Sequence, residues 1–130
     1  MPLTAETKKE IFEKMKSIMQ KQIPPLVISK NTDDNFELIG DKPVPYGSTK
    51  KIVPGMYFSS LLVRKDLISF HFFPMYINRE VFIPLIPNMI KILSGKTCFN
   101  IKKLEQMNEK ELSALFKRGI ELFKELGYLK

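Results

Sequence analysis

The sequence of 130 residues contains no tryptophan, a single histidine and a single cysteine. Because Cys98 has no second cysteine to pair with, an internal disulfide is excluded, which is typical of proteins from a reducing compartment. One cysteine and one histidine also give none of the ligand spacings typical of zinc sites. We therefore expect a cytoplasmic protein with a fold that depends on neither a disulfide nor zinc.

The sequence also lacks an apolar run long enough to cross a membrane. Its most apolar stretch, "EVFIPLIPNMIKIL", is shorter than the ~20 residues of a bilayer span and is interrupted by prolines. The first residues have no basic start followed by an apolar run, so we expect no signal peptide. Neither secretion nor a membrane partner is expected.

Arginine is scarce although the chain is basic. The net charge is +7, yet only Arg64, Arg79 and Arg118 carry the forked guanidinium group that reads bases and phosphates best. An excess of lysine favours solubility and long-range steering over readout. Weak nucleic-acid binding stays a third hypothesis, through these basic and aromatic side chains: Lys50, Lys51, Lys65, Lys96, Lys102, Lys103, Tyr57 and Tyr76.

Apolar residues are plentiful, at 44% of the sequence, and ten of them are phenylalanines. A chain of this length buries roughly two-thirds of its unfolded surface, which is enough for a phenylalanine-rich core. The sequence has no internal repeat and no low-complexity tract. These properties predict one globular domain over residues 1–130.

Two amphipathic helices are predicted near the ends of the chain. The first follows Thr4 as N-cap, buries Ile11, Phe12, Met15, Ile18 and Met19, and ends at Pro24 and Pro25. The last begins with a capping box of Asn108 and Glu111 and ends at Gly127. Its buried stripe, on which Gly119 permits close approach to a sheet, comprises Leu112, Leu115, Phe116, Phe123 and Leu126.

Aromatic and branched residues predict an antiparallel hairpin, with strands "MYFSSLLV" and "LISFHFF" around a tip at Lys65–Asp66. Alternation places Ile68, Phe70 and Phe72 on the core face of the second strand. Leu67, Ser69, His71 and Phe73 then lie on its other face.

Three further elements are expected. "FELIG" and "KTCFNIKKL" are strand candidates, and Cys98 and Asn100 share the non-core face of the latter. "EVFIPLIPNMIKILSG" is a helix candidate that begins near Pro84 or Pro87 and closes at Gly95. The segment 41–55, rich in proline and glycine, reads as a loop that could cover a ligand. The fold class is therefore α+β, with an antiparallel sheet packed against N- and C-terminal helices.

The stretch "GMYFSSLLVRKDLISFHFFPMY", followed by "LSGKTCFNIKKL" and a terminal amphipathic helix, resembles the YdhG-like family of small bacterial domains. The resemblance covers roughly residues 50–127. It implies a helix–sheet–helix sandwich, similar to the frataxin fold. Most members have no established activity, and the role proposed for a relative is intracellular iron handling.

Catalytic and nucleotide-binding signals are weak. "SGKT" lacks the second glycine of a phosphate loop, since Ile90 stands in its place, and a helix precedes it where a strand is needed. Cys98 could act as a nucleophile only with His71 as its base, and no third member of a triad is identifiable. A small buried thiol is the simpler interpretation. We expect no catalytic residues and no enzyme.

Iron binding is the alternative that the resemblance supports. Glu6, Glu10 and Glu13 form one stripe on the polar face of the first helix, and carboxylates suit a hard cation. The lysines beside this stripe would repel a cation. A solvated helix face is the competing interpretation.

We favour a non-enzymatic domain that binds a small ligand or a protein partner without a cofactor. Its predicted pocket lies between the second face of the hairpin and the loop at 41–55. If the helix predicted at residues 80–95 covered that face instead, His71 would be a buried structural histidine. The candidate ligand-binding residues, with Ser59 as a further member of the lining, are Tyr57, Ser69, His71, Tyr76, Lys96 and Cys98.

Overall fold

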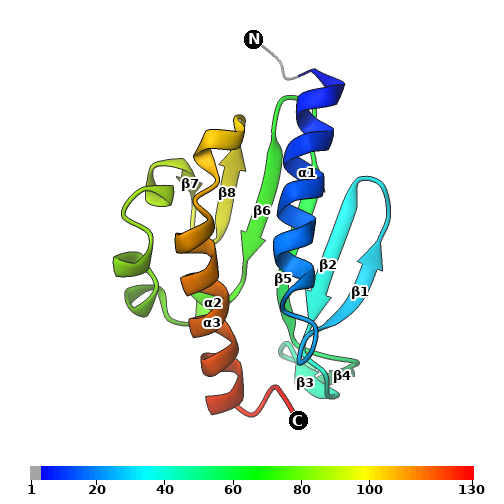
Figure 1. The fold of residues 1–130 in the computed structure, drawn as a ribbon. Helices are drawn as coiled ribbons and strands as arrows, with labels where there is room; N and C mark the ends of the chain where they lie inside the picture. Colours follow the sequence, from blue (N-terminus) through cyan, green and yellow to red (C-terminus); the bar gives the residue numbers. More distant parts are fainter. Residues whose placement is uncertain (1–3) are drawn as a thin grey trace.

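Two long helices pack side by side on one face of an antiparallel sheet in the computed structural model, which describes residues 4–130 (Figure 1). The six strands of this sheet lie in the order β1-β2-β5-β6-β8-β7, and β3 and β4 form a separate hairpin. Residues 1–3, which belong to the expected domain, lie outside the described residues. The helices are α1 (Ala5–Gln20), α2 (Pro74–Ile77) and α3 (Glu109–Glu125); the strands are β1 (Val27–Asn31), β2 (Asn35–Ile39), β3 (Val44–Tyr46), β4 (Lys51–Val53), β5 (Tyr57–Val63), β6 (Ile68–Phe72), β7 (Leu93–Ser94) and β8 (Cys98–Ile101).

The predicted α+β class is confirmed. All pairings in the large sheet are antiparallel, and the N-terminal and C-terminal helices both cover the same face. Between residues 4 and 130, no helix is both long and apolar enough to cross a bilayer.

Helix α1 forms as its sequence predicts at the start but ends early. The Thr4 hydroxyl accepts a hydrogen bond from the Thr7 N–H, and the expected apolar stripe is buried. The helix ends at Gln20 and not at the proline pair, because residues 21–25 form tight turns ahead of the first strand.

Helix α3 lies close against the sheet at Gly119. A β-carbon at this position would lie only 2.8 Å from the ring of Phe72 and 2.9 Å from that of Phe58. The predicted role of Gly119 is therefore confirmed. Leu126, expected on the buried stripe, is 43% exposed, and Leu122 is buried in its place.

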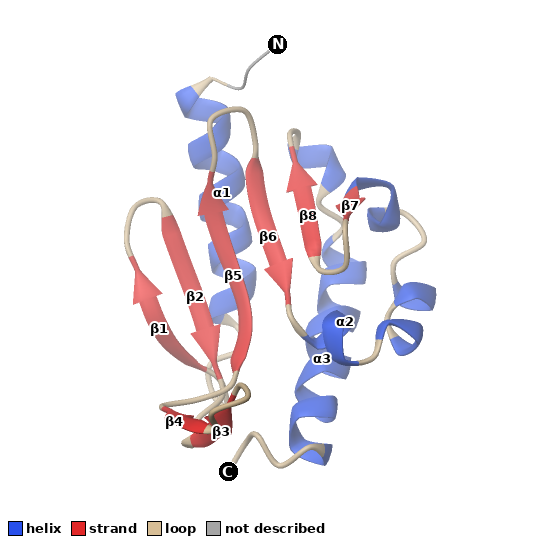
Figure 2. Ribbon diagram, turned by 180° about the vertical axis from the view of Figure 1, so that it is seen from behind, coloured by secondary structure: helices blue, strands red, loops and turns tan. Residues whose placement is uncertain are grey.

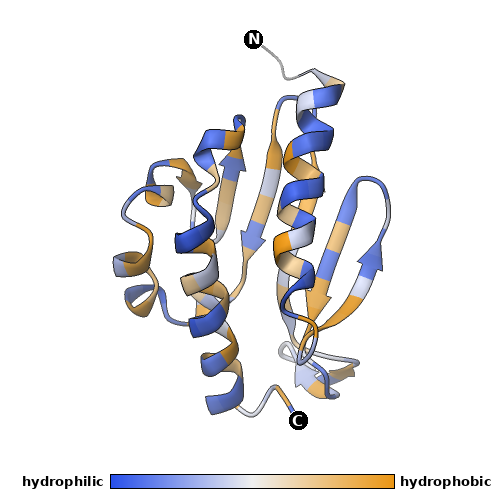
Figure 3. Ribbon diagram, viewed as in Figure 1, coloured by the Kyte–Doolittle hydropathy of each residue, from blue (hydrophilic) through white to orange (hydrophobic). Residues whose placement is uncertain are grey.

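Phenylalanine rings fill the space between the helices and the sheet. Phe58, Phe72 and Phe116 are fully buried, and the Phe58 and Phe72 rings meet edge-on at 5.5 Å between centroids. The Phe116 ring packs on both, at 6.2 Å and 5.9 Å. Buried hydrophobic side chains of the sheet and of both helices thus form one core. Figure 3 shows hydrophobic and hydrophilic residues interspersed along both helices and the strands.

The helix predicted at residues 80–95 is wrong. Three short 3-10 turns occupy the segment, at Arg79–Val81, Ile83–Leu85 and Met89–Ile92, and they pass beside α3 towards the β7 edge. Pro87 would interrupt an α-helix that began at Pro84, because it removes a backbone donor. Gly95 adopts a positive φ of 67°, but it closes the β7–β8 hairpin and no helix.

Glu111 does not form the predicted capping box. Asn108 caps α3 by accepting from the Glu111 N–H, as expected, but the Glu111 carboxylate turns away. It accepts from the Met89 N–H at 2.8 Å and from the Asn88 side-chain amide at 2.6 Å. This buried carboxylate therefore holds the 3-10 turn at Met89–Ile92 against the first turn of α3.

Candidate functional site

The face of the sheet opposite α1 and α3, here called the open face, carries no helix across its central strands in residues 4–130 (Figure 2). Cross-strand partners share a face of a sheet, so the register identifies the side chains on it. Ser60 of β5 pairs with Glu37 of β2 and with His71 of β6, and His71 pairs with Cys98 of β8. A polar row therefore runs across four strands of the open face.

Most of the predicted ligand-binding residues meet on this face. Ser69 lies two residues before His71 on the same face and pairs with Asn100, as alternation predicted. Ser69 is buried, whereas His71 and Cys98 are half-buried. The helix expected as a possible cover is absent from the described chain, so the imidazole reaches solvent.

The prediction that Ser59 lines the face of His71 is wrong. The pairing of β2 and β5 shifts by one residue between Leu38 and Ile39, which makes Phe58 the extra residue of a β-bulge. Ser59 pairs with Phe72 and is fully buried on the helix side, so it does not line the face of His71. Ser60 takes that place, because strict alternation does not hold across a bulge.

An aromatic chain extends the open face beyond the end of β6. The Tyr57 and Phe73 ring centroids are 5.6 Å apart, and Phe73 stacks on Tyr76 at 5.7 Å. The Lys96 amine lies 5.3 Å from the centroid of the Tyr76 ring, within reach of a cation–π interaction. Tyr76 and Lys96 are therefore brought to the same face as Tyr57, although not to His71 itself. Phe73 was not among the predicted binding residues.

A hollow of about 360 Å³ lies between the open face and the β3–β4 hairpin. In Figure 2 this hairpin sits at the lower ends of β2 and β5. The hollow borders the segment 41–55, beside which a pocket was expected, but its other wall comes from β1 and β2, and Tyr57 is the one predicted binding residue in its lining. Its lining comprises Ser29, Glu37, Ile39, Tyr46, Val53, Pro54, Gly55 and Tyr57.

Two hydroxyl contacts fix the polar side of the hollow. The Tyr57 and Ser60 hydroxyl groups share a hydrogen bond, and Ser29 donates to the Glu37 carboxylate. Burial raises the pKa of Tyr57 to about 12 against the opposing effect of its bond with Ser60, and the negative charge of Glu37 adds to the rise. Tyr57 therefore stays a neutral phenol at physiological pH. Glu37 could have been found from the alternation of "FELIG", which puts Glu37 on one face of the strand and Phe36 and Leu38 on the other.

The pair of His71 and Cys98 is not arranged for nucleophilic catalysis. Burial raises the pKa of the Cys98 thiol and lowers that of the His71 imidazole, so both are neutral near pH 7. The thiol donates to the Asn100 side chain at 3.4 Å, and no hydrogen bond joins it to His71 within residues 4–130. Nothing in this geometry generates a thiolate.

Acidification is expected to destabilise the protein through His71. Burial, and next the charge of Arg64, lower the imidazole pKa in the folded state below its ordinary value of 6.5. Below that value the unfolded chain binds a proton that the folded chain resists, so the free energy of unfolding falls. Urea unfolding at about pH 7 and about pH 5 should show a smaller drop for His71→Gln than for the native chain. Equal drops would contradict this, since the chain has no other histidine to mask the effect.

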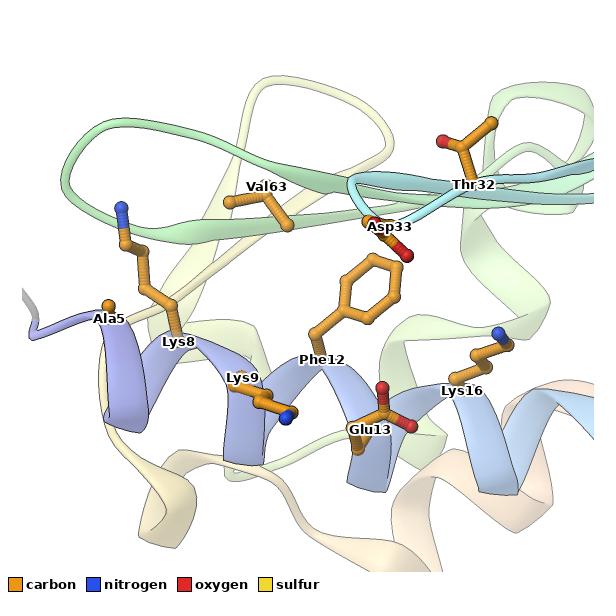
Figure 4. A pocket seen from close by; sticks show the side chains of 9 residues that line it. All are labelled: Ala5, Lys8, Lys9, Phe12, Glu13, Lys16, Thr32, Asp33 and Val63. Atoms are coloured by element: carbon orange, nitrogen blue, oxygen red, sulfur yellow. The ribbon is translucent and has the colours of Figure 1, made fainter.

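A second cleft, of about 510 Å³, lies between α1 and the β1–β2 turn (Figure 4). Lys8, Phe12 and Lys16 project from the helix towards the strands. The Lys8 amine donates to the backbone carbonyls of Arg64 and Lys65, and the Lys16 amine lies 5.3 Å from the centroid of the Phe36 ring. These lysines are thus engaged in holding α1 to the sheet.

The predicted iron ligands do not converge. Glu6, Glu10 and Glu13 are exposed on α1, and Glu13 lines the cleft together with lysines. No group of three or more histidine, cysteine, aspartate or glutamate side chains in the described part of the chain is placed to hold a metal ion.

No protein-family model, no curated protein and no solved structure matches this chain significantly. Membership of the YdhG-like family therefore stays a prediction. Function is inferred below from the geometry of the open face.

Proposed function

We propose that this protein is a non-enzymatic binding domain that takes a small organic ligand in the hollow between the open face and the β3–β4 hairpin. The observation that carries the proposal is the hollow itself. Its volume of about 360 Å³ falls within the range of small-molecule sites, about 300 to 1,000 Å³. Apolar side chains such as Ile39 and Val53 alternate there with the polar groups of Ser29, Glu37 and Tyr57.

The chemistry of the neighbouring residues favours binding over catalysis. A protonated thiol at Cys98, without a hydrogen bond to His71, gives no activated nucleophile. Tyr57, with its pKa raised to about 12, is a poor general base near neutral pH. The aromatic rings of Phe73 and Tyr76 already stack on each other, which leaves less ring surface for nucleic-acid bases.

A fragment screen tests the proposal. Small molecules are added to isotope-labelled protein, and amide chemical shifts are followed by NMR. Shifts are expected to gather at residues of the hollow, such as Glu37, Tyr46 and Gly55. Shifts confined to the α1 cleft, or a protein that responds to no fragment but binds a protein partner on the open face, would overturn the assignment of a small ligand to the hollow.

Two serine variants supply the matched control. Ser29 and Ser94 are both exposed, on the two edge strands β1 and β7. Ser29→Trp places an indole in the hollow and is expected to weaken fragment binding by about tenfold or more, a loss of about 1.4 kcal/mol. Ser94→Trp adds the same indole at the far edge and should leave binding unchanged. Equal affinities of the two variants would show that the ligand lies elsewhere.

A further inference from the structure

The hollow has a marked charge asymmetry. Glu37 is the one charged side chain among the described residues that line it. Its side chain is half-buried on β2 and forms part of the wall of the hollow. A ligand that enters the hollow therefore meets a single negative charge.

The Glu37 carboxylate has hydrogen-bond acceptor positions that the protein does not use. It accepts one hydrogen bond, from the Ser29 hydroxyl, whereas a carboxylate has about four acceptor positions. In residues 4–130, no lysine or arginine lies within ion-pairing distance of it. A cationic donor is the group that best fills the remaining positions.

Two tyrosine rings complete the site. Tyr57 has its hydroxyl engaged by Ser60, so the ring is what it offers to a ligand. Tyr46, on the β3 strand, is 49% exposed and lines the opposite side of the hollow. A ring face attracts an ammonium group, and more strongly when water is excluded. Ile39, Val53 and Pro54 supply apolar surface for the carbon atoms of such a ligand.

We propose that the hollow selects an organic ammonium ion, with Glu37 as its counter-charge and the Tyr46 and Tyr57 rings as its aromatic walls. This inference rests on the proposed function and names the class of ligand. The shared chemistry is a quaternary or primary ammonium group with an apolar body. We assign it to a free small molecule, because the lining provides for one compact headgroup.

Two lysines oppose such a ligand. Lys30 pairs with Glu37 across β1 and β2, and Lys51 pairs with Tyr46 across β3 and β4. Both are exposed, so water and salt screen their repulsion, over about 8 Å at physiological ionic strength. Removing the charge of Lys30 is therefore expected to strengthen the binding of a cation, whereas removing the charge of Glu37 is expected to weaken it.

Choline and its neutral isostere, in which carbon replaces the charged nitrogen, are the probes. Their affinities are measured by NMR titration on the native chain, Glu37→Gln and Lys30→Gln; each variant removes one charge. The native chain is expected to bind choline about tenfold more tightly than the isostere. Glu37→Gln should reduce this preference to the part that the tyrosine rings supply, without weakening the isostere, and Lys30→Gln should preserve or increase it. A peptide with one trimethyl-lysine presents the same headgroup on a protein side chain.

The outcomes separate this inference from the proposed function. Equal affinities for choline and the isostere would overturn the ammonium assignment while leaving the hollow as a ligand site. A preference of unchanged size in Glu37→Gln would remove Glu37 from its role. Tighter binding of the peptide than of choline would overturn the assignment to a free small molecule. If choline fails to bind but fragments still shift the hollow, only the present inference falls; if neither binds there, both do.

Discussion

Replacing Glu111 by alanine is expected to lower the free energy of unfolding by about 3 kcal/mol. Glu111 is 6% exposed, and its carboxylate accepts from the N–H groups of Asn88 and Met89 and from the Asn88 side chain. Alanine leaves the buried Met89 N–H without an acceptor, and an unpaired buried donor costs about 1–3 kcal/mol. The 3-10 turn at Met89–Ile92 should then detach from α3.

Glu109→Ala is the matched control for this change. Glu109 lies in the same first turn of α3, but it is exposed and forms only a surface ion pair with Lys14, at 3.3 Å. Its loss is expected to cost less than about 1 kcal/mol. Urea unfolding followed by circular dichroism measures both. Glu111→Gln keeps one acceptor oxygen, and its free energy of unfolding should lie between those of the two alanine variants. Equal stability of the two alanine variants would contradict a stabilising role for the hydrogen bonds of Glu111 with Asn88 and Met89.

Gly55→Ala is expected to destabilise the protein by about 3 kcal/mol, at the upper end of the usual cost of overpacking. An added β-carbon would overlap the carbonyl oxygen of Gly40 and lie 2.9 Å from its carbonyl carbon. These are backbone atoms, and the Gly40 N–H is itself bonded to the Met56 carbonyl at 2.8 Å. The strand end must therefore move, and the wall of the hollow to which Gly55 belongs moves with it.

Gly47→Ala separates crowding from backbone conformation. Gly47 lies in the β3–β4 turn with a φ of 79°, and a β-carbon there would meet nothing within 4 Å. Its alanine variant should lose about 1–2 kcal/mol, from the left-handed conformation alone. Thermal unfolding and the fragment titration, measured together, should show that only Gly55→Ala also weakens binding. A Gly55→Ala variant as stable as Gly47→Ala would contradict the close contact of the two glycines.

The two terminal helices and the central hairpin were predictable because local periodicity determines them. Alternation in β6 correctly put Phe70 in the core and His71 on the opposite face, and the same rule placed Cys98 beside it. Residues 80–95 were misread because a run of apolar residues satisfies a helical pattern even where Pro87 interrupts the helix.

The hollow could be anticipated only in outline. A pocket beside the segment 41–55 was expected, but its lining depends on the bulge at Phe58 and on the contact of Gly40 with Gly55. Both features arise from pairing between segments distant in the sequence, which no local pattern encodes. Tyr46 was missed for that reason, whereas Glu37 stands in "FELIG", where the alternation with Phe36 and Leu38 could have indicated it.

The one-sided covering of the sheet has a consequence for how freely this protein can change. Nearly all the large buried side chains, including Phe58, Phe72 and Phe116, lie between the sheet and its two helices. Side chains outside that core, such as Glu37 on the open face and Tyr46 on the β3–β4 hairpin, contribute little to that packing. Substitutions there can alter which molecule is bound at small cost in stability. The same backbone is thus a scaffold on which specificity can be redesigned, or can diverge in evolution, independently of folding.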